Sequence, residues 1–296
     1  MSVPTVARKD FEDAVRSQML WSITGLLVGL IVLIYGGIRY FEGSVPAADL
    51  AAILALPMQV IVPLAALIVG YMAIVGERRS GSIKILLSLP PTREDVVAGK
   101  LLGRAGVVAT AVLSAFAVAL VLGLVLFGEV AASELVGLAA ATLLLGFAFV
   151  GIAVGVSAAV ASRGRAMAGV VGTYLVFLGF WDVLVGGIYR LLTGAFPSSP
   201  ITPDSQIEPW ALALQRVNPM EAYGVVASGL MDQQVFPLTL QFPIGINVFS
   251  DAPVDDIVIG DAPMYLSEWF AAVVLLAWGV VPVALGYLRF RSADLG

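Results

Sequence analysis

Residues 77–100 read ERRSGSIKILLSLPPTREDVVAGK, and this charged interval separates two long apolar runs. Six of the sixteen lysines and arginines in the chain fall between positions 77 and 104. Short loops rich in Lys and Arg lie on the cytoplasmic side of membranes, so the interval predicts a cytoplasmic loop between two membrane spans. The positions of the other segments are interpreted relative to this loop.

A short helix is predicted inside the loop. Ile83, Leu86 and Leu87 have the i, i+3, i+4 spacing of one helix face, and Ile85 and Leu89 add a second apolar edge. A helix that is apolar on two sides needs a second surface to cover it. Two interpretations follow from the pattern alone: the helix lies among lipid headgroups, or it docks on a partner protein.

Proline and a helix cap bound this short helix. Pro90 and Pro91 end it, because proline lacks a backbone N–H donor and restricts the residue before it. Thr92 is then placed to cap the next helix. Glu94 and Asp95 fall in the first turn of that helix, where negative charge is favourable.

The order of residues in the loop resembles the first cytoplasmic loop of type-2 ATP-binding-cassette (ABC) exporter permeases. The resemblance is carried by Glu77, Arg78, Gly81, Ser82, Ile83, Leu86, Leu87, Pro90, Arg93 and Lys100. Ser82 departs from the usual threonine and Pro91 from the usual aliphatic residue. The resemblance implies that residues 80–89 form a coupling helix, seated in a groove of a separate ATPase subunit and pushed when ATP closes that subunit.

The composition indicates a membrane protein. Hydrophobic residues make up 59% of the chain and the mean hydropathy is +0.97, well above the values of soluble domains. Cysteine and histidine are absent, which excludes disulfides, thiolate chemistry and histidine-dependent catalysis or metal binding. The net charge of -5 arises from acidic segments predicted to lie outside the cell, so it indicates no nucleic-acid partner.

A membrane span needs about 20 apolar residues. Six segments meet this requirement: Leu20–Tyr40, Leu50–Val75, Leu101–Phe127, Leu135–Ala161, Ala166–Leu192 and Trp269–Tyr287. An even number of spans puts both termini on one side, and Arg163 and Arg165 of the second inner loop put that side in the cytoplasm. We therefore expect an all-α polytopic protein of the plasma membrane with both termini cytoplasmic.

Local patterns predict details of the spans. Pro57 and Pro63 predict a kink in the second span, where Gln59 should face protein rather than lipid. Two G-x-x-x-G pairs allow close helix approach, one in the first span and one in the fourth. Their residues are Gly25 with Gly29 and Gly151 with Gly155.

The chain is predicted to have three parts. Residues 1–192 contain an amphipathic N-terminal helix at the inner interface, the first five spans and the coupling loop. Residues 193–266 form an extracytoplasmic segment, and residues 267–296 form the sixth span with a cytoplasmic tail. The N-terminal helix should present Phe11, Ala14, Val15 and Gln18 on one face. It is not expected to be a cleaved signal peptide, because the apolar run after it is too long.

Residues 193–266 hold nine of the sixteen prolines, too many for a continuous span. Asn218, Pro219 and Glu221 match the N-cap, N1 and N3 positions of a capping box, which predicts one short helix before Asn218 and one after it. Type-2 ABC exporters have a comparable pair of outer helices. The long outer segment also resembles that of permeases associated with nitrous-oxide reductase maturation, although no Met, His or Cys cluster supports copper handling.

The chain lacks the residues to hydrolyse ATP. A P-loop needs G-x-x-x-x-G-K-[ST], and the nearest match, at Gly99 and Lys100, has Glu94 in place of the first glycine and Leu101 in place of the hydroxyl. We therefore expect no cofactor in this chain and place ATP and Mg²⁺ on a partner ATPase. The chain itself is expected to be a non-catalytic subunit.

Asp182 is the one acidic residue inside a predicted span. An Asp at mid-bilayer costs about 2.5–3.5 kcal/mol on the insertion scale, and Asp182 falls in the outer third, where that cost is lower. It is interpreted either as a polar point on a translocation path or as a snorkelling or hydrogen-bonded acid near the outer interface. At the inner side, Glu77 and Arg78 could pair with the ATPase or with the second inner loop.

These observations favour the permease subunit of an ABC exporter, paired with itself or a homologous permease and with two ATPase subunits. The competing interpretation is a secondary-active transporter or a membrane scaffold that needs no ATP. Intramembrane ion-coupling residues would mark a secondary transporter, and Asp182 is the one candidate that the sequence offers.

Overall fold

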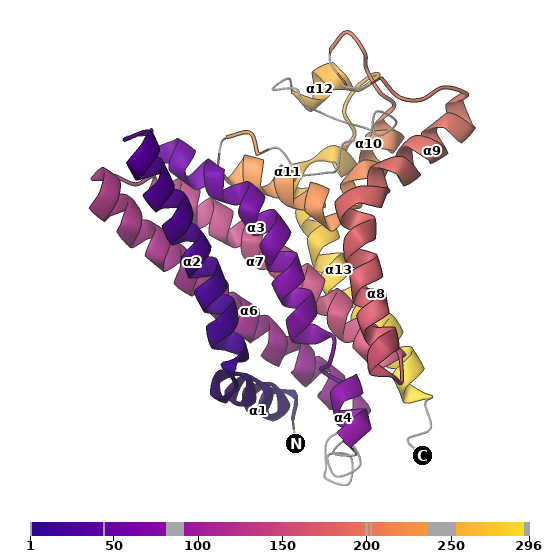
Figure 1. The fold of residues 1–296 in the computed structure, drawn as a ribbon. Helices are drawn as coiled ribbons and strands as arrows, with labels where there is room; N and C mark the ends of the chain where they lie inside the picture. The colour runs from indigo at the N-terminus through magenta and orange to yellow at the C-terminus, as the bar shows by residue number, and fades with distance from the viewer. Residues whose placement is uncertain are drawn as a thin grey trace.

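The computed structural model is a bundle of long apolar helices with a group of short helices at one end (Figure 1). It describes residues 2–43, 45–80, 92–198, 201, 203–231, 233–235 and 253–292. Six helical segments in these ranges are long and apolar enough to cross a membrane. Regular structure there is entirely helical, apart from one isolated bridge between Ile207 and Val258. The protein is thus an all-α polytopic membrane protein.

The elements follow the predicted order. They are α1 (Val3–Arg16), α2 (Gln18–Phe41), α3 (Ala47–Gly70), α4 (Val75–Ser80), α6 (Arg93–Phe127), α7 (Ala132–Ala159), α8 (Arg163–Leu175), the π-helical turn η1 (Val176–Phe180), α9 (Trp181–Thr193), α10 (Pro209–Arg216), α11 (Pro219–Met231), α12 (Val254–Ile257), the 3-10 turn η2 (Met264–Leu266) and α13 (Glu268–Arg291). All six predicted spans are present, as α2, α3, α6, α7, α8 to α9, and α13.

The two ends of the bundle differ. Figure 1 shows α1 lying across one end, where α4 and the last turn of α13 also lie, and this is called the α1 end below. The short helices α10, α11 and α12 gather at the opposite end, called the α11 end. The predicted amphipathic helix is present, but α1 stops at Arg16 and Ser17 caps α2, so Gln18 belongs to the first span rather than to the face of α1.

The second span is interrupted near the α1 end. Helix α3 ends at Gly70, and α4 begins at Val75 after a short turn. The Ser157 hydroxyl of α7 accepts the backbone N–H groups of Ile74 and Val75, both at 3.1 Å. A side chain from a neighbouring span thus supplies the hydrogen bonds that a helix start lacks.

The fifth span is interrupted near the α11 end. The sequence predicts a continuous helix, but a π-helical turn separates α8 from α9, and α9 leans away from the line of α8 (Figure 1). The Asn218 side chain donates a hydrogen bond of 2.8 Å to the Phe177 carbonyl within this turn. Bends in long helices commonly arise where such an inserted residue disturbs the hydrogen-bond ladder.

The two predicted short helices on either side of Asn218 are α10 and α11. Asn218 caps α11, since its Oδ1 accepts the N–H of Met220 at 2.9 Å. The reciprocal half of the predicted capping box is wrong: the Asn218 N–H donates to the Gln215 carbonyl rather than to Glu221. Gln59 of the kinked α3 faces protein as predicted, donating to the Met220 carbonyl at 2.9 Å.

Helix α7 packs closely on α13 through glycine. A Cβ atom at Gly151 would meet the Gly279 carbonyl oxygen, and one at Gly155 would meet that of Pro282. The predicted close approach at this G-x-x-x-G pair is therefore confirmed. A Cβ atom at Gly25 or Gly29 of α2 would have no heavy atom of the described chain within 4 Å, so that pair makes no helix contact within this subunit.

The substitution Gly151→Ala should destabilise the protein, because its methyl group meets backbone that cannot move aside. Such overpacking costs about 1–3 kcal/mol, whereas Ala at an open helix position is more favourable than Gly by about 1 kcal/mol. Gly25→Ala is the matched control, since it also lies in a G-x-x-x-G pair. Thermal unfolding in detergent should separate the two variants, and equal midpoint temperatures would contradict the packing described.

Candidate functional site

Of the predicted coupling segment and its flanks, the structure describes the flanking residues on either side. The central residues of the segment lie outside the described ranges, namely Gly81, Ser82, Ile83, Leu86, Leu87 and Pro90. Arg78 lies in α4, and its side chain is likewise outside the description. Glu77 precedes the segment, while Arg93 and Lys100 follow it on α6. Contacts of these three side chains show what the segment is attached to.

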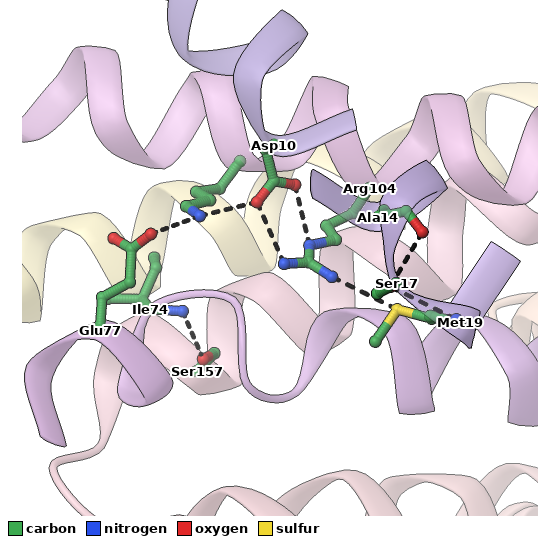
Figure 2. Close-up of polar contacts among 9 residues, drawn as sticks. Asp10, Ala14, Ser17, Met19, Ile74, Glu77, Arg104 and Ser157 are labelled. Atoms are coloured by element: carbon green, nitrogen blue, oxygen red, sulfur yellow. Dashed lines mark hydrogen bonds and ion pairs between the residues drawn. The ribbon is translucent and has the colours of Figure 1, made fainter. Parts of the chain in front are cut away.

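A buried ion network joins α1, α4 and α6 at the base of the segment (Figure 2). Lys100 Nζ lies 2.7 Å from Asp10 Oδ1 and 2.5 Å from Glu77 Oε1. The guanidinium of Arg104 binds the same aspartate through two nitrogens, with Nε 2.8 Å from Oδ2 and a terminal nitrogen 3.0 Å from Oδ1. Asp10 of α1 therefore binds two cations of α6, one of which also binds α4.

The network is balanced in charge and largely removed from solvent. Two carboxylates face two cations, and the residue exposures of Asp10 and Lys100 are 2% and 7%. Charges buried in this way are tolerated when paired, but removing one partner leaves an uncompensated charge in a poorly solvated place. The network consequently fixes the position of α4 relative to α1 and α6.

Glycine allows α1 to approach α6 closely enough for these contacts. A Cβ at Gly99 would lie 2.5 Å from the Val6 Cβ, and one at Gly103 would lie 2.8 Å from Asp10 Oδ2. Residues four apart share a helix face, so the two glycines form a groove next to Lys100 and Arg104. Helix α1 is thus seated on α6, with its aspartate held between two cations.

The other flank of the segment is attached to α13. Thr92 caps α6 through the N–H of Asp95, whose carboxylate accepts the N–H of Thr92, as the sequence predicted. Arg93 donates to the carbonyls of Phe290 and Arg291, at 2.7 and 2.8 Å. A cation at the carboxyl end of a helix is favourably placed against the helix dipole. The start of α6 is therefore tied to the end of the sixth span.

The second inner loop lies beside the turn that follows α3. Arg163 donates to the Tyr71 hydroxyl at 3.4 Å, and Ser162 caps α8 by accepting the N–H of Arg165. The side chains of Arg163 and Arg165 are exposed. Glu77 forms an ion pair with Lys100 of α6, a pairing that the sequence analysis did not predict.

Asp182 lies far from this network, in the first turn of α9 near the α11 end. Its side chain is buried, and Oδ1 accepts a hydrogen bond of 2.5 Å from the Gln215 amide. This placement matches the interpretation as a hydrogen-bonded acid. A role in a translocation path stays a prediction.

Asp10 was not recognised from the sequence. In the amphipathic pattern of residues 1–19 it falls among charged positions, which are normally solvated. The sequence does contain one indication of this contact in the residues that bind Asp10. Lys100 and Arg104 share one face near the start of α6, and the rest of the helix after Lys100 is apolar. Two cations in such a place require an acid from a neighbouring element, and α1 is close in sequence to the first span.

Six apolar helices, an amphipathic helix across one end and a buried ion network between them define a polytopic membrane protein. Residues 4–295 match the family model described as "ABC-2 family transporter protein". Because the match covers nearly the whole chain, the chain belongs to the ABC-2 transporter family. It is accordingly a permease subunit of an ABC transporter.

Two relatives carry more particular names. The chain is 30% identical over 302 residues to the "Probable ABC transporter permease protein NosY" of Pseudomonas aeruginosa, an alignment that covers 97% of this chain and 98% of the relative. It is 28% identical over 309 residues to the protein of the same name from Stutzerimonas stutzeri, covering 97% and 96%. The similarity thus extends through the short helices at the α11 end as well as the spans.

Asp10→Asn should destabilise the protein by about 3–5 kcal/mol, because it leaves Lys100 and Arg104 without their shared anion. Adding Arg104→Met should recover part of the loss, because Lys100 still pairs with Glu77 whereas Arg104 has lost its anion. The measurement is thermal unfolding of the single and double variants. Glu12→Gln is the control, since Glu12 pairs with Arg8 in an exposed position and should have no measurable effect. Additive effects of Asp10→Asn and Arg104→Met would contradict the network.

Proposed function

We propose that this permease subunit belongs to an exporter driven by a separate ATPase subunit, which binds ATP and Mg²⁺ and docks on residues 80–89. The observation that carries the proposal is the ion network at the base of this segment. Glu77 and Lys100 flank the segment and meet each other and Asp10 in a buried cluster. A push on the segment would therefore reach α1, α4 and α6 together.

The hydrogen bonds at both flanks extend this path into the bundle. On one flank, α4 begins at a turn held by Ser157 of α7. On the other flank, Arg93 holds the last carbonyls of α13. Motion of the docked segment would thus act on the second, third, fourth and sixth spans through short, directional contacts rather than through apolar packing alone.

We place the α1 end in the cytoplasm and the α11 end outside, with the protein in the plasma membrane. The support is the positive-inside rule. The α1 end carries the basic loop, Arg163 and Arg165, and the two arginines near the end of α13, Arg289 and Arg291. Both termini are then cytoplasmic, and the substrate moves toward the α11 end.

We also propose that the functional unit contains two permease subunits, either two copies of this chain or this chain with a homologue, and two ATPase subunits. The support is the resemblance of the coupling loop to that of type-2 exporters. A Cβ added at Gly25 or Gly29 of α2 would meet no atom of the described chain within 4 Å, which leaves this part of α2 open to lipid or to a second subunit. Oligomeric state in detergent tests this part directly.

A docked ATPase distinguishes this proposal from a secondary transporter or a scaffold. Leu86→Asp puts a charge on the predicted docking face, so a soluble ATPase that co-purifies with the wild-type chain should be lost or should no longer be stimulated by the permease. Ser88→Asp adds the same charge at a polar position of the same predicted helix and should leave the ATPase bound. Transport that continues without any ATPase would refute the proposal.

Asp182 tests the predicted translocation path. Asp182→Asn keeps the size of the side chain and removes its charge, so a role on the path predicts reduced transport at unchanged expression. The measurement is ATP-dependent flux into inverted vesicles, compared with the amount of folded protein. Unchanged flux would leave Asp182 as a structural acid bound to Gln215.

A further inference from the structure

The α10–α11 corner, defined here as residues 214–221, is held by side chains from three spans. Trp181 of α9 donates to the Leu214 carbonyl at 3.2 Å, and Trp278 of α13 donates to the Val217 carbonyl at 2.8 Å. Gln59 of α3 donates to the Met220 carbonyl. The backbone oxygens of the corner are thus supplied with hydrogen-bond donors from outside it.

Two side-chain acceptor atoms inside the corner have no hydrogen-bond donor among the described residues. Gln215 is 2% exposed, and its amide nitrogen donates to Asp182 Oδ1 at 2.5 Å; the same side chain also interacts with the Glu221 carboxyl. Glu221 is half-buried as a residue, but its Oε1 atom is buried, as is Gln215 Oε1, and neither atom has a hydrogen-bond partner among the described residues. The second oxygen of Asp182, Oδ2, is likewise buried and accepts no hydrogen bond there. Ionised carboxylates and amide oxygens are acceptors only, so Gln215 Oε1 and Glu221 Oε1 cannot satisfy each other without a proton.

We propose that Glu221 is a proton-binding site and donates its proton to the amide oxygen of Gln215. A carboxylic acid and a primary amide can form a ring of two hydrogen bonds, in which the amide N–H meets one carboxyl oxygen and the acid O–H meets the amide oxygen. One bound proton would therefore satisfy both buried atoms at once. The inference concerns the α11 end alone and holds whether or not an ATPase drives the protein.

The charges around Glu221 favour the neutral acid. Asp182 faces it from α9, Arg216 from α10, and Glu268 of α13 acts on the same arginine. An ionised Glu221 would thus add a third carboxylate beside one cation. Of the other elements packed on α11, α3 and α7 contact it through uncharged groups, with Gln59 on the Met220 carbonyl and Thr142 near the Tyr223 hydroxyl, and η1 has no charged residue. The single charge of α3, Asp49, lies in its first turn, ten residues before Gln59. The single charge of α7, Glu134, lies two turns from Thr142.

The burial and the charges around Glu221 also determine the pKa of its carboxyl group. Burial first, and the charge of Asp182 second, raise the pKa of Glu221 to about 8, despite the opposing effect of Arg216. An unfolded chain would ionise this carboxyl near its ordinary pKa of 4.5. Between about pH 4.5 and about pH 8 the folded protein therefore holds a proton that the unfolded chain releases, so stability should fall as the pH rises through this window and level off above it.

Infrared spectroscopy of the full-length protein in detergent tests the proposal. The pH is the only variable, so the proton is the only ligand that is titrated. The wild type should show the carbonyl stretch of a protonated carboxylic acid at neutral pH, lost as the pH rises past about 8, and Glu221→Gln should lack this band. Glu12→Gln is the control, because the pKa of Glu12 is lowered by its hydrogen bond and ion pair with Arg8. A neutral-pH wild-type spectrum without the band would overturn the proposal, as would a band that persists in Glu221→Gln or disappears only in Asp182→Asn.

Thermal unfolding provides a second readout that does not depend on the spectrum. Glu221→Gln replaces the acid with an amide of the same size, which cannot ionise. The midpoint temperature of the wild type should fall between about pH 4.5 and about pH 8, and that of the variant should not. Above about pH 8 the midpoint temperature of the variant should therefore exceed that of the wild type. A Glu221→Gln variant with an unchanged pH profile would overturn the proposal.

Discussion

Polar groups buried between apolar helices must be satisfied by other helices, because neither lipid nor a packed core offers them water. At the α1 end this constraint is met by the ion network of Asp10, Glu77, Lys100 and Arg104. Each of the four side chains depends on a neighbour from another element. The positions of α1, α4 and α6 are therefore linked by electrostatics, and the linkage lies at the base of the predicted coupling segment.

The α11 end meets the same constraint by different means. Its corner is held mainly by neutral hydrogen bonds, in which the indole N–H groups of Trp181 and Trp278 and the amide of Gln59 reach backbone carbonyls. Tryptophan suits this task, because it combines a large apolar ring with one donor. The ion network and the α10–α11 corner lie at opposite ends of the bundle. Between them, α7 and α13 pack with their backbones in contact at glycine residues.

The features predicted correctly from sequence depend on residues close together in the chain. Hydropathy over about 20 residues located the six spans, and the capping preferences of Thr92 and Asn218 located the starts of α6 and α11. The features that were missed depend on distant residues. Asp10 and Lys100 are 90 positions apart, and the π-helical turn of the fifth span is hydrogen-bonded to Asn218, 41 residues from Phe177. No local pattern around Asp10 or Phe177 indicates these contacts, and the one sequence signal for the ion network is the helix face that Lys100 and Arg104 share.

The interruptions in the second and fifth spans indicate how the two ends can be connected without moving as one rigid body. The break after Gly70 lies near the α1 end and is held by Ser157, whereas the π-helical turn lies near the α11 end and is held by Asn218. In both cases a single side chain from another element supplies the hydrogen bonds that the span lacks. Each break is held by one or two hydrogen bonds, worth about 1 kcal/mol net each, whereas α7 and α13 place backbone against backbone at Gly151 and Gly155. The second and fifth spans are therefore each divided into two helical pieces that side chains of other elements hold, while α7 and α13 are continuous helices in direct contact.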